Sequence, residues 1–481
     1  MTALAEAVIA ELARQGVRAA RLCADSRHIR PGDVFVAMPG KRSDGGDYVA
    51  DAVARGAVAV LHQGVLLPLG VPTVAVADIA GQAGEIAHLV FGRPSEQLWL
   101  AGVTGTNGKT SVSQWIAQAM TALGRRCAVV GTLGTGFPGQ LDPGVNTTPD
   151  AVSLQAALAR FVDEKAAACA MEVSSIGIEE GRVNGVHFAV AVFTNLTQDH
   201  LDYHGSMAAY GAAKRRLFSW PGLRAAVINL DDAFGLDLAR SLSGAVKVIG
   251  YTLNGQSGGD FTLAAGDLSM GDQGSGFKID GVEFFAPVVG RFNASNLLAV
   301  IGTLLAADQS PADIAAVLRH IVPPPGRMQT LGGGKQPLVV IDYAHTPDAL
   351  EKALGALRDT VTARGGKLIC VFGCGGDRDR GKRPQMGAVA ERLAERVIVS
   401  SDNPRHENPM TIIADILAGM KSKPQVEVDR AIAIDTALAG ADRADVVLLA
   451  GKGHETYQEV AGERSPFSDL DQARAALERR S

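Results

Sequence analysis

Short apolar runs that end in glycine-rich or acidic turns recur along the chain and predict buried strands alternating with helices. From Leu98 onward the runs LWLAGVTG, RCAVVGTLG, AACAMEVSS, VAVFTNLT and RAAVINLDD follow one another, and helical stretches lie between several of them. Continuous apolar, β-branched runs are typical of strands that are buried on both faces of a sheet. The alternation therefore predicts an α/β fold with a mostly parallel sheet covered by helices.

The same pattern divides the chain of 481 residues into three predicted domains. Residues 1–97 predict a small mixed α/β domain, and residues 98–325 predict a central domain in which segment 245–290 forms an antiparallel appendage. The run Pro323-Pro324-Pro325-Gly326 predicts a linker, because proline stiffens the chain and glycine permits a turn. The apolar runs resume beyond it, so residues 326–481 predict a second, Rossmann-like domain.

Composition and charge narrow the class of protein. Hydrophobic residues make up 47 % and charged residues 20 % of the chain, as in ordinary globular proteins. The formal net charge of −5 argues against nucleic-acid binding, and the five cysteines, without a Cys-x-x-Cys pair, predict buried thiols in a reducing compartment. The N-terminal segment lacks the basic start of a signal peptide, and no apolar run is long enough to span a membrane. We therefore expect a soluble, cytoplasmic protein, with a monomer as its default state.

The strongest chemical signal is a glycine-rich loop after the first apolar run of the predicted central domain. The run LWLAGVT leads into Gly105-Thr106-Asn107-Gly108-Lys109-Thr110, and a helix is predicted from about Lys109. In such a loop the backbone N–H groups converge on phosphates, the lysine supplies a positive charge, and the threonine hydroxyl can bind Mg²⁺. The common pattern has glycine where Val103 stands here, so the match is partial. The order of strand, loop and helix still predicts a P-loop domain that binds ATP.

Other segments of the predicted central domain offer metal ligands. Glu172 follows the apolar run AACAM, and we expect its carboxylate to face the phosphate loop and hold Mg²⁺. The motif TNLTQDHLDYHG, residues 194–205, offers His200 for a second Mg²⁺. Zinc held by His200 and His204 is an alternative, although no third ligand follows at a suitable spacing. By spacing alone, Lys214 is an ordinary solvent-exposed lysine on a helix.

Charged loops follow apolar runs of the predicted C-terminal domain as well. Arg378 lies in GCGGDRDRGKRP, Arg405 lies in SDNPRHENP, and Glu455 lies in AGKGHETYQ. Ligands bind at the carboxyl ends of strands in open α/β sheets, and arginine suits bidentate capture of a carboxylate. Because Glu455 can hold an ammonium group, the three side chains together predict an amino-acid substrate.

These motifs together resemble those of the Mur ligases, which form amide bonds in peptidoglycan synthesis. The segments GTNGKT, MEVSS, TNLTQDHLDYHG, GRFNASN (290–296), PGRMQ (325–329), DYAHTPDAL (342–350) and DNPRHE (402–407) occur in the family's order, as does DSRHIRPGDVFVAMPG near the N-terminus. The resemblance covers nearly the whole chain. It implies a domain for a UDP group, a central ATPase domain and a C-terminal domain for the incoming amino acid. The DNPR motif is similar to that of the diaminopimelate-adding branch, in which Arg405 would meet the carboxylate that lysine lacks.

The resemblance also implies roles for single residues. Catalysis is expected to involve Lys109, His200 and Lys214, which in this family is carbamylated. ATP is expected to contact Gly105, Thr106, Asn107, Gly108, Lys109, Thr110, Asn293 and Arg327, and two Mg²⁺ ions are expected at Thr110, Glu172, His200 and carbamylated Lys214. The UDP-muramyl peptide is expected at Ser26, Thr147, Thr148, Ser174 and Arg182, and diaminopimelate at Arg378, Asp402, Asn403, Arg405, Gly451 and Glu455. At position 176 this chain has isoleucine where the family often has histidine.

The implied reaction is amide formation driven by ATP. The γ-phosphoryl group would pass to the D-glutamyl side-chain carboxylate of UDP-N-acetylmuramoyl-L-alanyl-D-glutamate, and the amine of meso-diaminopimelate would then displace phosphate from the acyl phosphate. Lys109 and two Mg²⁺ ions would screen the anionic groups. A lysine-adding or folylpolyglutamate ligase of the same architecture is one alternative. A nucleotide-hydrolysing switch is another, but it leaves Arg378, Arg405 and Glu455 without a purpose.

Overall fold

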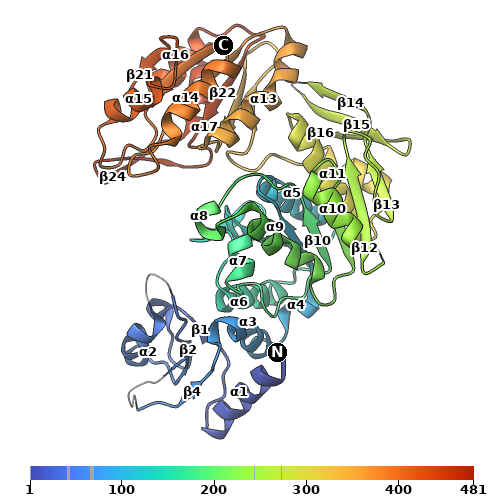
Figure 1. The fold of residues 1–481 in the computed structure, drawn as a ribbon, viewed down its shortest axis with the longest axis vertical. Helices are drawn as coiled ribbons and strands as arrows, with labels where there is room; N and C mark the ends of the chain where they lie inside the picture. The colour runs from blue at the N-terminus through green and yellow to red at the C-terminus, as the bar shows by residue number, and fades with distance from the viewer. Residues whose placement is uncertain (1, 41–43, 65–69, 243, 272, 481) are drawn as a thin grey trace. The chain divides into compact units, whose positions relative to one another are not determined.

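The computed structural model describes residues 2–40, 44–64, 70–242, 244–271 and 273–480 (Figure 1). The chain separates into two compact units, Met1–Ala264 with Leu298–Ile314 and Ala265–Leu297 with Ala315–Ser481. The helix α11 (Arg291–Ala306) contributes residues to both units. The boundaries of the three domains expected from the sequence stay a prediction.

The N-terminal sheet of the first unit is parallel and small. In the described residues its strands lie in sequence order: β1 (Leu22–Cys23), β2 (Val34–Val36), β3 (Ala59–His62) and β4 (Thr73–Ala75). Successive strand residues point to opposite faces. Val34 and Val36 therefore pack under α1 (Thr2–Arg14) and α3 (Ile79–Val90), whereas Phe35 packs on the side of α2 (Val49–Ala54).

The central sheet of the first unit confirms the predicted α/β fold. Its described strands run in the order β13-β12-β11-β10-β5-β9-β6-β7-β8, and all neighbours from β13 to β6 are parallel. Only the edge hairpin of β7 and β8 is antiparallel. The bounds are β5 (Trp99–Thr104), β6 (Cys127–Gly131), β7 (Gly134–Phe137), β8 (Gln140–Asp142), β9 (Ala168–Glu172), β10 (Val190–Phe193), β11 (Ala225–Asn229), β12 (Lys247–Thr252) and β13 (Phe261–Ala264).

The connections of the central sheet place the phosphate loop at a topological switch point. The chain leaves β5 for β6 on one side, returns through β9 next to β5, and then crosses to β10 on the other side of β5. Ligands bind in open α/β sheets where the strand order reverses in this way. The helices of this part are α4 (Pro94–Gln97), α5 (Lys109–Ala122), α6 (Ala151–Asp163), α7 (Ser175–Glu179), α8 (Leu201–His204), α9 (Met207–Arg215) and α10 (Ala233–Ser241).

The expectation of an antiparallel appendage over residues 245–290 is wrong for its first half. β12 and β13 pair in parallel and extend the central sheet, because Val248, Ile249 and Tyr251 are buried like the residues of an inner strand. The antiparallel part consists of β14 (Gly266–Gly271), β15 (Gly274–Ile279) and β16 (Val282–Ala286), and it belongs to the second unit.

The C-terminal sheet of the second unit is the predicted Rossmann-like layer. Its described strands run in the order β17-β18-β22-β19-β20-β21, and only β17 is antiparallel. Leu368, Cys370 and Phe372 face one helical layer, whereas Ile369 and Val371 face the other. The strands are β17 (Gln329–Gly332), β18 (Leu338–Asp342), β19 (Leu368–Phe372), β20 (Arg396–Ser400), β21 (Gln425–Glu427) and β22 (Val446–Ala450). The first helical layer holds α13 (Pro347–Arg364), α14 (Lys382–Leu393) and α15 (Pro409–Leu417), and the second holds α16 (Arg430–Ala439) and α17 (Asp469–Glu478).

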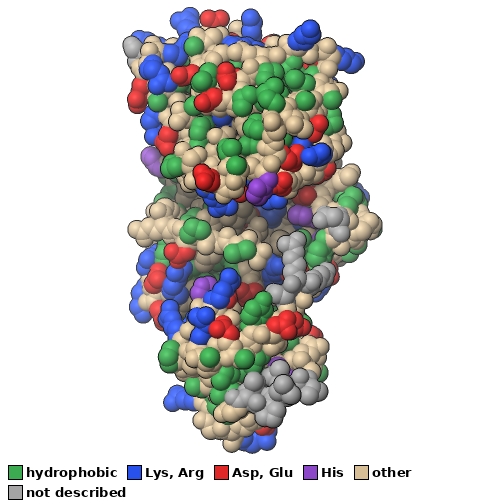
Figure 2. All heavy atoms as spheres, turned by 90° about the vertical axis from the view of Figure 1, so that its left-hand side faces the viewer, with side chains coloured by type: hydrophobic (Ala, Val, Ile, Leu, Met, Phe, Trp, Pro, Cys, Tyr) green, Lys and Arg blue, Asp and Glu red, His purple; other side chains and the backbone are tan. Residues whose placement is uncertain are grey.

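Local signals explain where these helices begin and end. The Thr346 side chain accepts a hydrogen bond from the Ala349 N–H, Pro347 occupies the first turn, and Gly365 ends α13 with a left-handed φ of 69°. The five cysteines are free and buried, as predicted. Within the described ranges, no helix has the length and apolar character needed to cross a membrane. Figure 2 shows acidic and basic side chains interspersed on the face in view.

Candidate active site

The phosphate loop follows β5 and begins one residue after that strand ends. Gly105 has a φ of 146°, and a Cβ there would lie 1.9 Å from the Thr194 Oγ1. Gly108 has a φ of 87° and precedes the first residue of α5, Lys109. Val103, which breaks the common pattern, is a buried residue of β5 that pairs with its neighbouring strands. The missing glycine therefore concerns the strand and leaves the loop geometry intact.

Two lysine side chains converge on this loop. The Lys109 Nζ donates to the carbonyls of Gly105 and Thr106, each at 2.9 Å, and the Lys214 Nζ donates to the same Gly105 carbonyl at 3.0 Å. Lys214 lies on α9 and is 1 % exposed, whereas its spacing had suggested a solvent-exposed lysine. Burial, and then the neighbouring Lys109 ammonium, hold the pKa of Lys214 well below its usual range. The expectation that Lys214 is an ordinary surface residue is therefore wrong.

The segment after β10 holds the phosphate loop in place. The Asn195 side chain accepts from the Asn107 N–H at 3.0 Å and donates to the Asn107 carbonyl at 3.1 Å. The Thr106 hydroxyl donates to the Thr197 carbonyl at 3.1 Å and lies 3.2 Å from the Tyr210 hydroxyl. The motif TNLT and the Tyr210 hydroxyl thus hold the loop in place. The sequence had given no sign of this role for Asn195 or Tyr210.

Glu172 ends β9 and is almost completely buried. Its carboxylate accepts from the Thr132 N–H at 2.8 Å and from the Thr132 hydroxyl at 3.2 Å. A Cβ on Gly131 would lie 2.3 Å from the Glu172 Oε1, so this glycine makes room for the carboxylate. The Thr132 hydroxyl also lies 3.0 Å from the Thr147 hydroxyl. Thr132 therefore connects a predicted metal ligand with a predicted substrate contact, and the sequence had given no signal for it.

One network joins three more residues expected to contact the muramyl peptide, Thr148, Ser174 and Arg182. The Thr148 hydroxyl lies 2.9 Å from the Glu172 carbonyl and 3.1 Å from the Ser174 Oγ. The Arg182 guanidinium donates to the Thr148 carbonyl at 2.8 Å and pairs with Glu180 at 2.5 Å. The structure therefore brings these residues beside Glu172 within the first unit.

Ser26 lies elsewhere in the first unit, in the N-terminal sheet region. It is buried and begins a short 3-10 helix, Ser26–His28, whose cap is Asp25. The residues around it line a cavity of about 450 Å³, together with Val152, Ser153 and Ala156 of α6. The cavity lining from the N-terminal part comprises Arg21, Leu22, Cys23, Ala24, Asp25, Arg27, His28, Ile29 and Arg30.

The two histidines of residues 194–205 have different partners among the described side chains. His200 has a left-handed φ of 52°, and its Nε2 lies 3.5 Å from Asp199. The His204 Nε2 instead lies 2.9 Å from the Ser175 hydroxyl on α7, the helix that also contains the half-buried Ile176. Within the part of the chain that the structure describes, the residues placed to hold an ion in a group of three are His88, Glu96 and His187.

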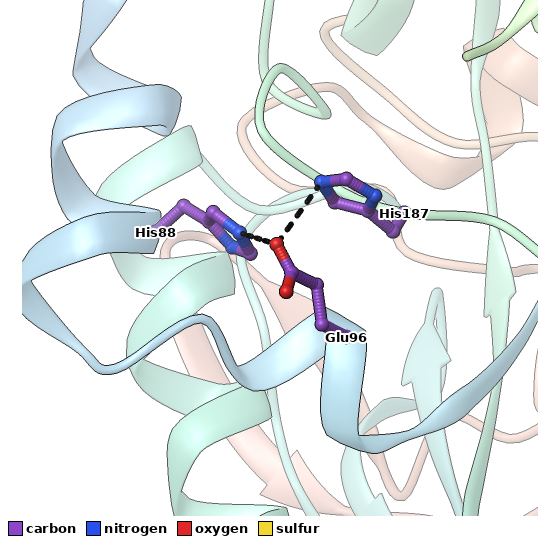
Figure 3. A group of neighbouring side chains, drawn as sticks. All are labelled: His88, Glu96 and His187. Carbon is purple, nitrogen blue, oxygen red and sulfur yellow. Dashed lines mark hydrogen bonds and ion pairs between the residues drawn. The ribbon is translucent and has the colours of Figure 1, made fainter. Parts of the chain in front are cut away.

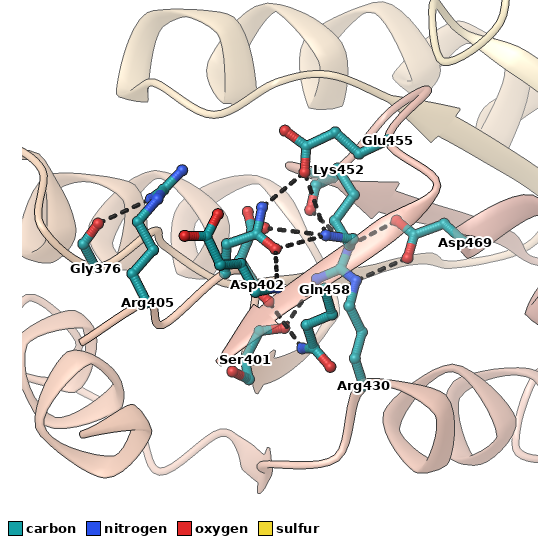
Figure 4. Close-up of polar contacts among 12 residues, drawn as sticks. Gly376, Ser401, Asp402, Arg405, Arg430, Lys452, Glu455, Gln458 and Asp469 are labelled. Carbon is teal, nitrogen blue, oxygen red and sulfur yellow. Dashed lines mark hydrogen bonds and ion pairs between the residues drawn. The ribbon is translucent and has the colours of Figure 1, made fainter. Parts of the chain in front are cut away.

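In the second unit, a buried ionic cluster lies after β20 and β22 (Figure 4). The Lys452 Nζ lies 3.0 Å from the Asn403 Oδ1, 3.2 Å from Glu455 and 3.7 Å from Asp402. The Asn403 amide also donates to Glu455 at 2.7 Å. Lys452 is completely buried, so it fixes the positions of three predicted diaminopimelate contacts. Sequence reasoning missed Lys452, although it lies between two glycines directly after a buried strand.

Gly451 allows this cluster to form. Its φ is +115°, and a Cβ there would lie 2.8 Å from the Asp402 Oδ2. Residues other than glycine rarely adopt such a backbone conformation, and the Asp402 carboxylate leaves no space for a Cβ. The glycine therefore lets the loop after β22 approach the loop after β20.

Arg405 lies beside the cluster in a left-handed turn with a φ of 52°. One of its guanidinium nitrogens donates to the Gly376 carbonyl at 2.8 Å, and no other hydrogen bond from this side chain is present among the described residues (Figure 4). Glu407, two residues later, pairs with the buried Arg383 at 2.8 Å. The loop after β20 is thus fixed to the loop after β19. Arg378, in that same loop, is exposed and donates to the Asp377 carbonyl at 3.1 Å.

Asn293 and Arg327, the other predicted ATP contacts, belong to the second unit as well. Asn293 is buried at the start of α11 and donates to the Val289 carbonyl at 2.9 Å. The Arg327 guanidinium lies 5.3 Å from the centre of the Tyr343 ring, and its Nε is buried without a hydrogen-bond partner among the described residues. The neighbouring Asp342, whose pKa burial raises, accepts from the Met328 N–H at 2.9 Å. Whether Asn293 and Arg327 contact ATP stays a prediction.

A phosphate loop on one parallel sheet and a charged cluster at the strand ends of another define a nucleotide-using α/β enzyme. Residues 19–83 match the Mur ligase family catalytic domain, residues 103–304 match the Mur ligase middle domain, and residues 326–453 match the Mur ligase glutamate ligase domain. These matches confirm the resemblance seen in the motifs. The chain belongs to the Mur ligase family.

Individual relatives agree with this assignment. The chain is 54 % identical over 476 residues to UDP-N-acetylmuramoyl-L-alanyl-D-glutamate–2,6-diaminopimelate ligase of Ectopseudomonas mendocina, covering 97 % of this chain and 96 % of that protein. It is 52 % identical over 467 residues to the ligase of the same name from Pseudomonas aeruginosa, covering 95 % and 94 %. A solved structure of a ligase with this name aligns with a TM-score of 0.71 at 36 % identity, covering 96 % of this chain and 95 % of that one. The fold is shared with a MurF ligase from Thermotoga maritima in complex with ADP, at a TM-score of 0.65 and 18 % identity, covering 97 % and 99 %.

Proposed function

We propose that this protein is an ATP-dependent ligase that adds meso-diaminopimelate to the D-glutamyl side-chain carboxylate of UDP-N-acetylmuramoyl-L-alanyl-D-glutamate. The observation that supports this most directly is Arg405, which is anchored on the Gly376 carbonyl beside the buried Asn403, Lys452 and Glu455 cluster. An anchored guanidinium can bind a carboxylate, and a neighbouring glutamate can bind an ammonium group. Diaminopimelate has both groups at the end where lysine has only the ammonium.

The phosphate loop of the first unit is the proposed ATP site. Backbone N–H groups at the start of α5 would meet the phosphates, and the Lys109 ammonium would exchange the loop carbonyls for the β- and γ-phosphates. Transfer of the γ-phosphoryl group to the D-glutamyl carboxylate gives an acyl phosphate and ADP. Attack by the diaminopimelate amine then forms the amide, while phosphate leaves with the bonding electron pair and the amine loses a proton.

Residues near the loop offer oxygen and nitrogen atoms as ligands for Mg²⁺. Thr110 and Glu172 would hold one ion, and His200 with a carbamate on Lys214 would hold a second. When bound, Mg²⁺ would neutralise charge on the phosphoryl oxygens during transfer. The fit is supported by the burial of Glu172 and Thr110, whose polar groups lie at the edge of the sheet where the phosphate loop begins.

The surroundings of Lys214 support its carbamylation. Its lowered pKa favours the neutral amine, which can attack carbon dioxide to form a carbamate and release one proton. The product is an anion beside Lys109, so the like-charge repulsion between the two side chains becomes an attraction. The new carboxylate oxygens would be suitable Mg²⁺ ligands.

Coupling of phosphate release to both substrates tests the proposal. We expect release to require UDP-muramyl-Ala-Glu together with an amino acid, and meso-diaminopimelate to be strongly preferred over lysine. In Arg405→Ala, kcat/KM for diaminopimelate should fall roughly 10–100-fold, as for a lost hydrogen bond to a charged group, whereas the low rate with lysine should change little. Rapid release from ATP alone would favour a nucleotide-hydrolysing switch, and a preference for lysine would overturn the proposed substrate.

Proposals on substrate size, cellular location and oligomeric state accompany this reaction. The substrates are small molecules, and we propose that the enzyme works in the cytoplasm, where ATP and nucleotide-linked precursors occur. A monomer is the proposed state. Size-exclusion chromatography with light scattering measures this state directly.

A further inference from the structure

Three ligand side chains meet in the first unit, away from the phosphate loop (Figure 3). His88 lies on α3, Glu96 lies on α4, and His187 lies in the loop that leads into β10. The Glu96 Oε1 is 3.3 Å from the His88 Nε2 and 3.8 Å from the His187 Nε2. One nitrogen or oxygen atom of each residue lies within 4.8 Å of the others. The proposed ligase reaction uses none of these residues.

This spacing fits a tetrahedral transition-metal site. Zinc binds histidine nitrogen and carboxylate oxygen at about 2.0–2.2 Å, which places neighbouring tetrahedral ligands roughly 3.4 Å apart. The two measured separations lie near this value, so small side-chain rotations would bring both histidines and Glu96 to one ion. Glu96 and His187 are partly exposed, with 40 % and 48 % of their side chains accessible. An ion could therefore enter from solvent and keep a water molecule as its fourth ligand.

The buried Ser95 contacts the His88 ring and the backbone of His187. Its hydroxyl lies 3.5 Å from the His88 Nδ1, and it accepts from the backbone N–H of His187 at 3.1 Å. It also lies 3.4 Å from the Gly185 carbonyl, to which it can donate. A partner at Nδ1 directs the other ring nitrogen, Nε2, toward Glu96, and such outer contacts are typical of histidine metal ligands. The His88 and His187 rings stack with their centroids 5.2 Å apart.

We propose that His88, Glu96 and His187 bind a divalent transition-metal ion of the Zn²⁺ class. The ion would join the segment that leads from the N-terminal sheet into β5 to the loop that leads into β10, which is the parallel neighbour of β5. Its role is a structural clamp within the first unit. Arg93, whose guanidinium lies 3.4 Å from the Glu96 Oε1 and is about half exposed, would move into solvent when the ion binds.

Metal titration of the full chain tests this site. Zn²⁺ binding is measured by calorimetry in excess Mg²⁺, and Co²⁺ binding by its visible absorption, which is intense for tetrahedral ions and weak for octahedral ones. We expect one ion per chain with the tetrahedral Co²⁺ spectrum. His187→Gln and Glu96→Gln should each weaken binding at least about tenfold, and Ser95→Ala should weaken it by a similar factor. The control His320→Gln changes an exposed histidine outside the cluster and should bind like the wild type.

Thermal unfolding separates a clamp from simple surface binding. Zn²⁺ should raise the unfolding temperature of the wild type and of His320→Gln, because an ion that binds only the folded state stabilises it. It should leave that of His187→Gln unchanged. Since His187 is about half exposed, the metal-free His187→Gln variant should unfold like the wild type, which shows that it is folded. Equal Zn²⁺ affinity in the wild type and His187→Gln, or an octahedral Co²⁺ spectrum in the wild type, would overturn the proposal.

Discussion

At the scale of single residues, the shared Gly105 carbonyl is the most informative contact of the first unit. The Lys109 ammonium and the Lys214 amino group both donate to this one oxygen. The Lys109 charge at the start of α5 is suited to an anionic ligand, and a phosphate chain is the anion that the loop geometry predicts. The environment of Lys214, rather than its place in the sequence, also favours a neutral amine.

Replacement of Lys109 by alanine should reduce kcat by roughly 10²–10³-fold or more, because a positive charge that stabilises the transferring phosphoryl group is lost. The fold should survive, since the hydrogen bonds from the ammonium to the Gly105 and Thr106 carbonyls lie within the loop itself. Steady-state phosphate release measures the loss, and far-UV circular dichroism checks the fold. Lys423→Ala removes an exposed lysine as a matched control. Near-normal turnover in Lys109→Ala would contradict the assignment of the phosphate loop.

At the scale of elements, the loops after β19, β20 and β22 decide the proposed amino-acid site. They come from separate parts of the chain and meet because parallel strands end at the same edge of the sheet. Buried contacts hold them together: Lys452 with Asn403 and Asp402 inside the cluster, and Arg383 with Glu407 beside it. The backbone of each loop is therefore as important for the site as the side chains that would touch the substrate.

Gly451→Ala should disturb the contact between the loops after β20 and β22. The positive φ and the 2.8 Å approach of the Asp402 Oδ2 to the added Cβ should cost about 1–3 kcal/mol, and KM for diaminopimelate should rise more than KM for ATP. Urea unfolding and steady-state kinetics measure the two effects. Gly355→Ala, at an open position of α13, should be neutral or slightly stabilising. An unchanged KM for diaminopimelate would contradict this role of Gly451.

Glu407 should make the stability of the second unit dependent on pH. Hydrogen bonds from Arg383 and from the Asp377 N–H lower the pKa of its carboxyl from about 4.5 to about 2. The folded state therefore binds this proton less readily than the unfolded state, so the stabilisation is complete above about pH 4.5 and is lost as the pH falls toward 2.

The stability difference between wild type and Glu407→Gln, measured by urea unfolding, should accordingly shrink between pH 6 and pH 3. Glu478→Gln, at an exposed position of α17, is the control and should differ little from the wild type throughout. A difference that stays constant with pH would show that Glu407 acts by packing and not by charge.

At the scale of the whole molecule, the chain is two units, and the helices α11 and α12 (Pro311–Leu318) contribute residues to both. Segment 265–297 lies before the predicted linker in sequence but belongs to the second unit, where Val289 is buried in the core with Met328 and Leu338. The antiparallel strands β14 to β16 accompany it. A fragment that begins at residue 326 would therefore lack part of its own core.

Val289→Ala should destabilise the second unit by about 1–3 kcal/mol, because it removes two buried methyl groups. The three tryptophans, Trp99, Trp115 and Trp220, all belong to the first unit. Urea unfolding followed by tryptophan fluorescence should therefore be unchanged, whereas the transition followed by circular dichroism should begin at lower urea. A joint shift of both signals would show that the units unfold as one cooperative body.

The sequence by itself determined the α/β class, the parallel sheets and the phosphate loop, because buried strands and glycine turns depend on local pattern and backbone freedom. It also indicated the family, because seven short motifs in a fixed order are specific. The wrong assignment of β12 and β13 arose because short apolar runs with many glycines have the same local pattern in parallel and antiparallel pairing.

Only the tertiary structure decided which side chains meet. The burial of Lys214 and Lys452 depends on segments far away in the chain, and a lysine in a sequence gives no sign of what will cover it. The same holds for Thr132, which joins Glu172 to Thr147, and for His88, Glu96 and His187, which α3, α4 and a distant loop bring together. Local pattern fixes the elements, whereas contacts between elements fix the charges and pKa values on which the chemistry depends.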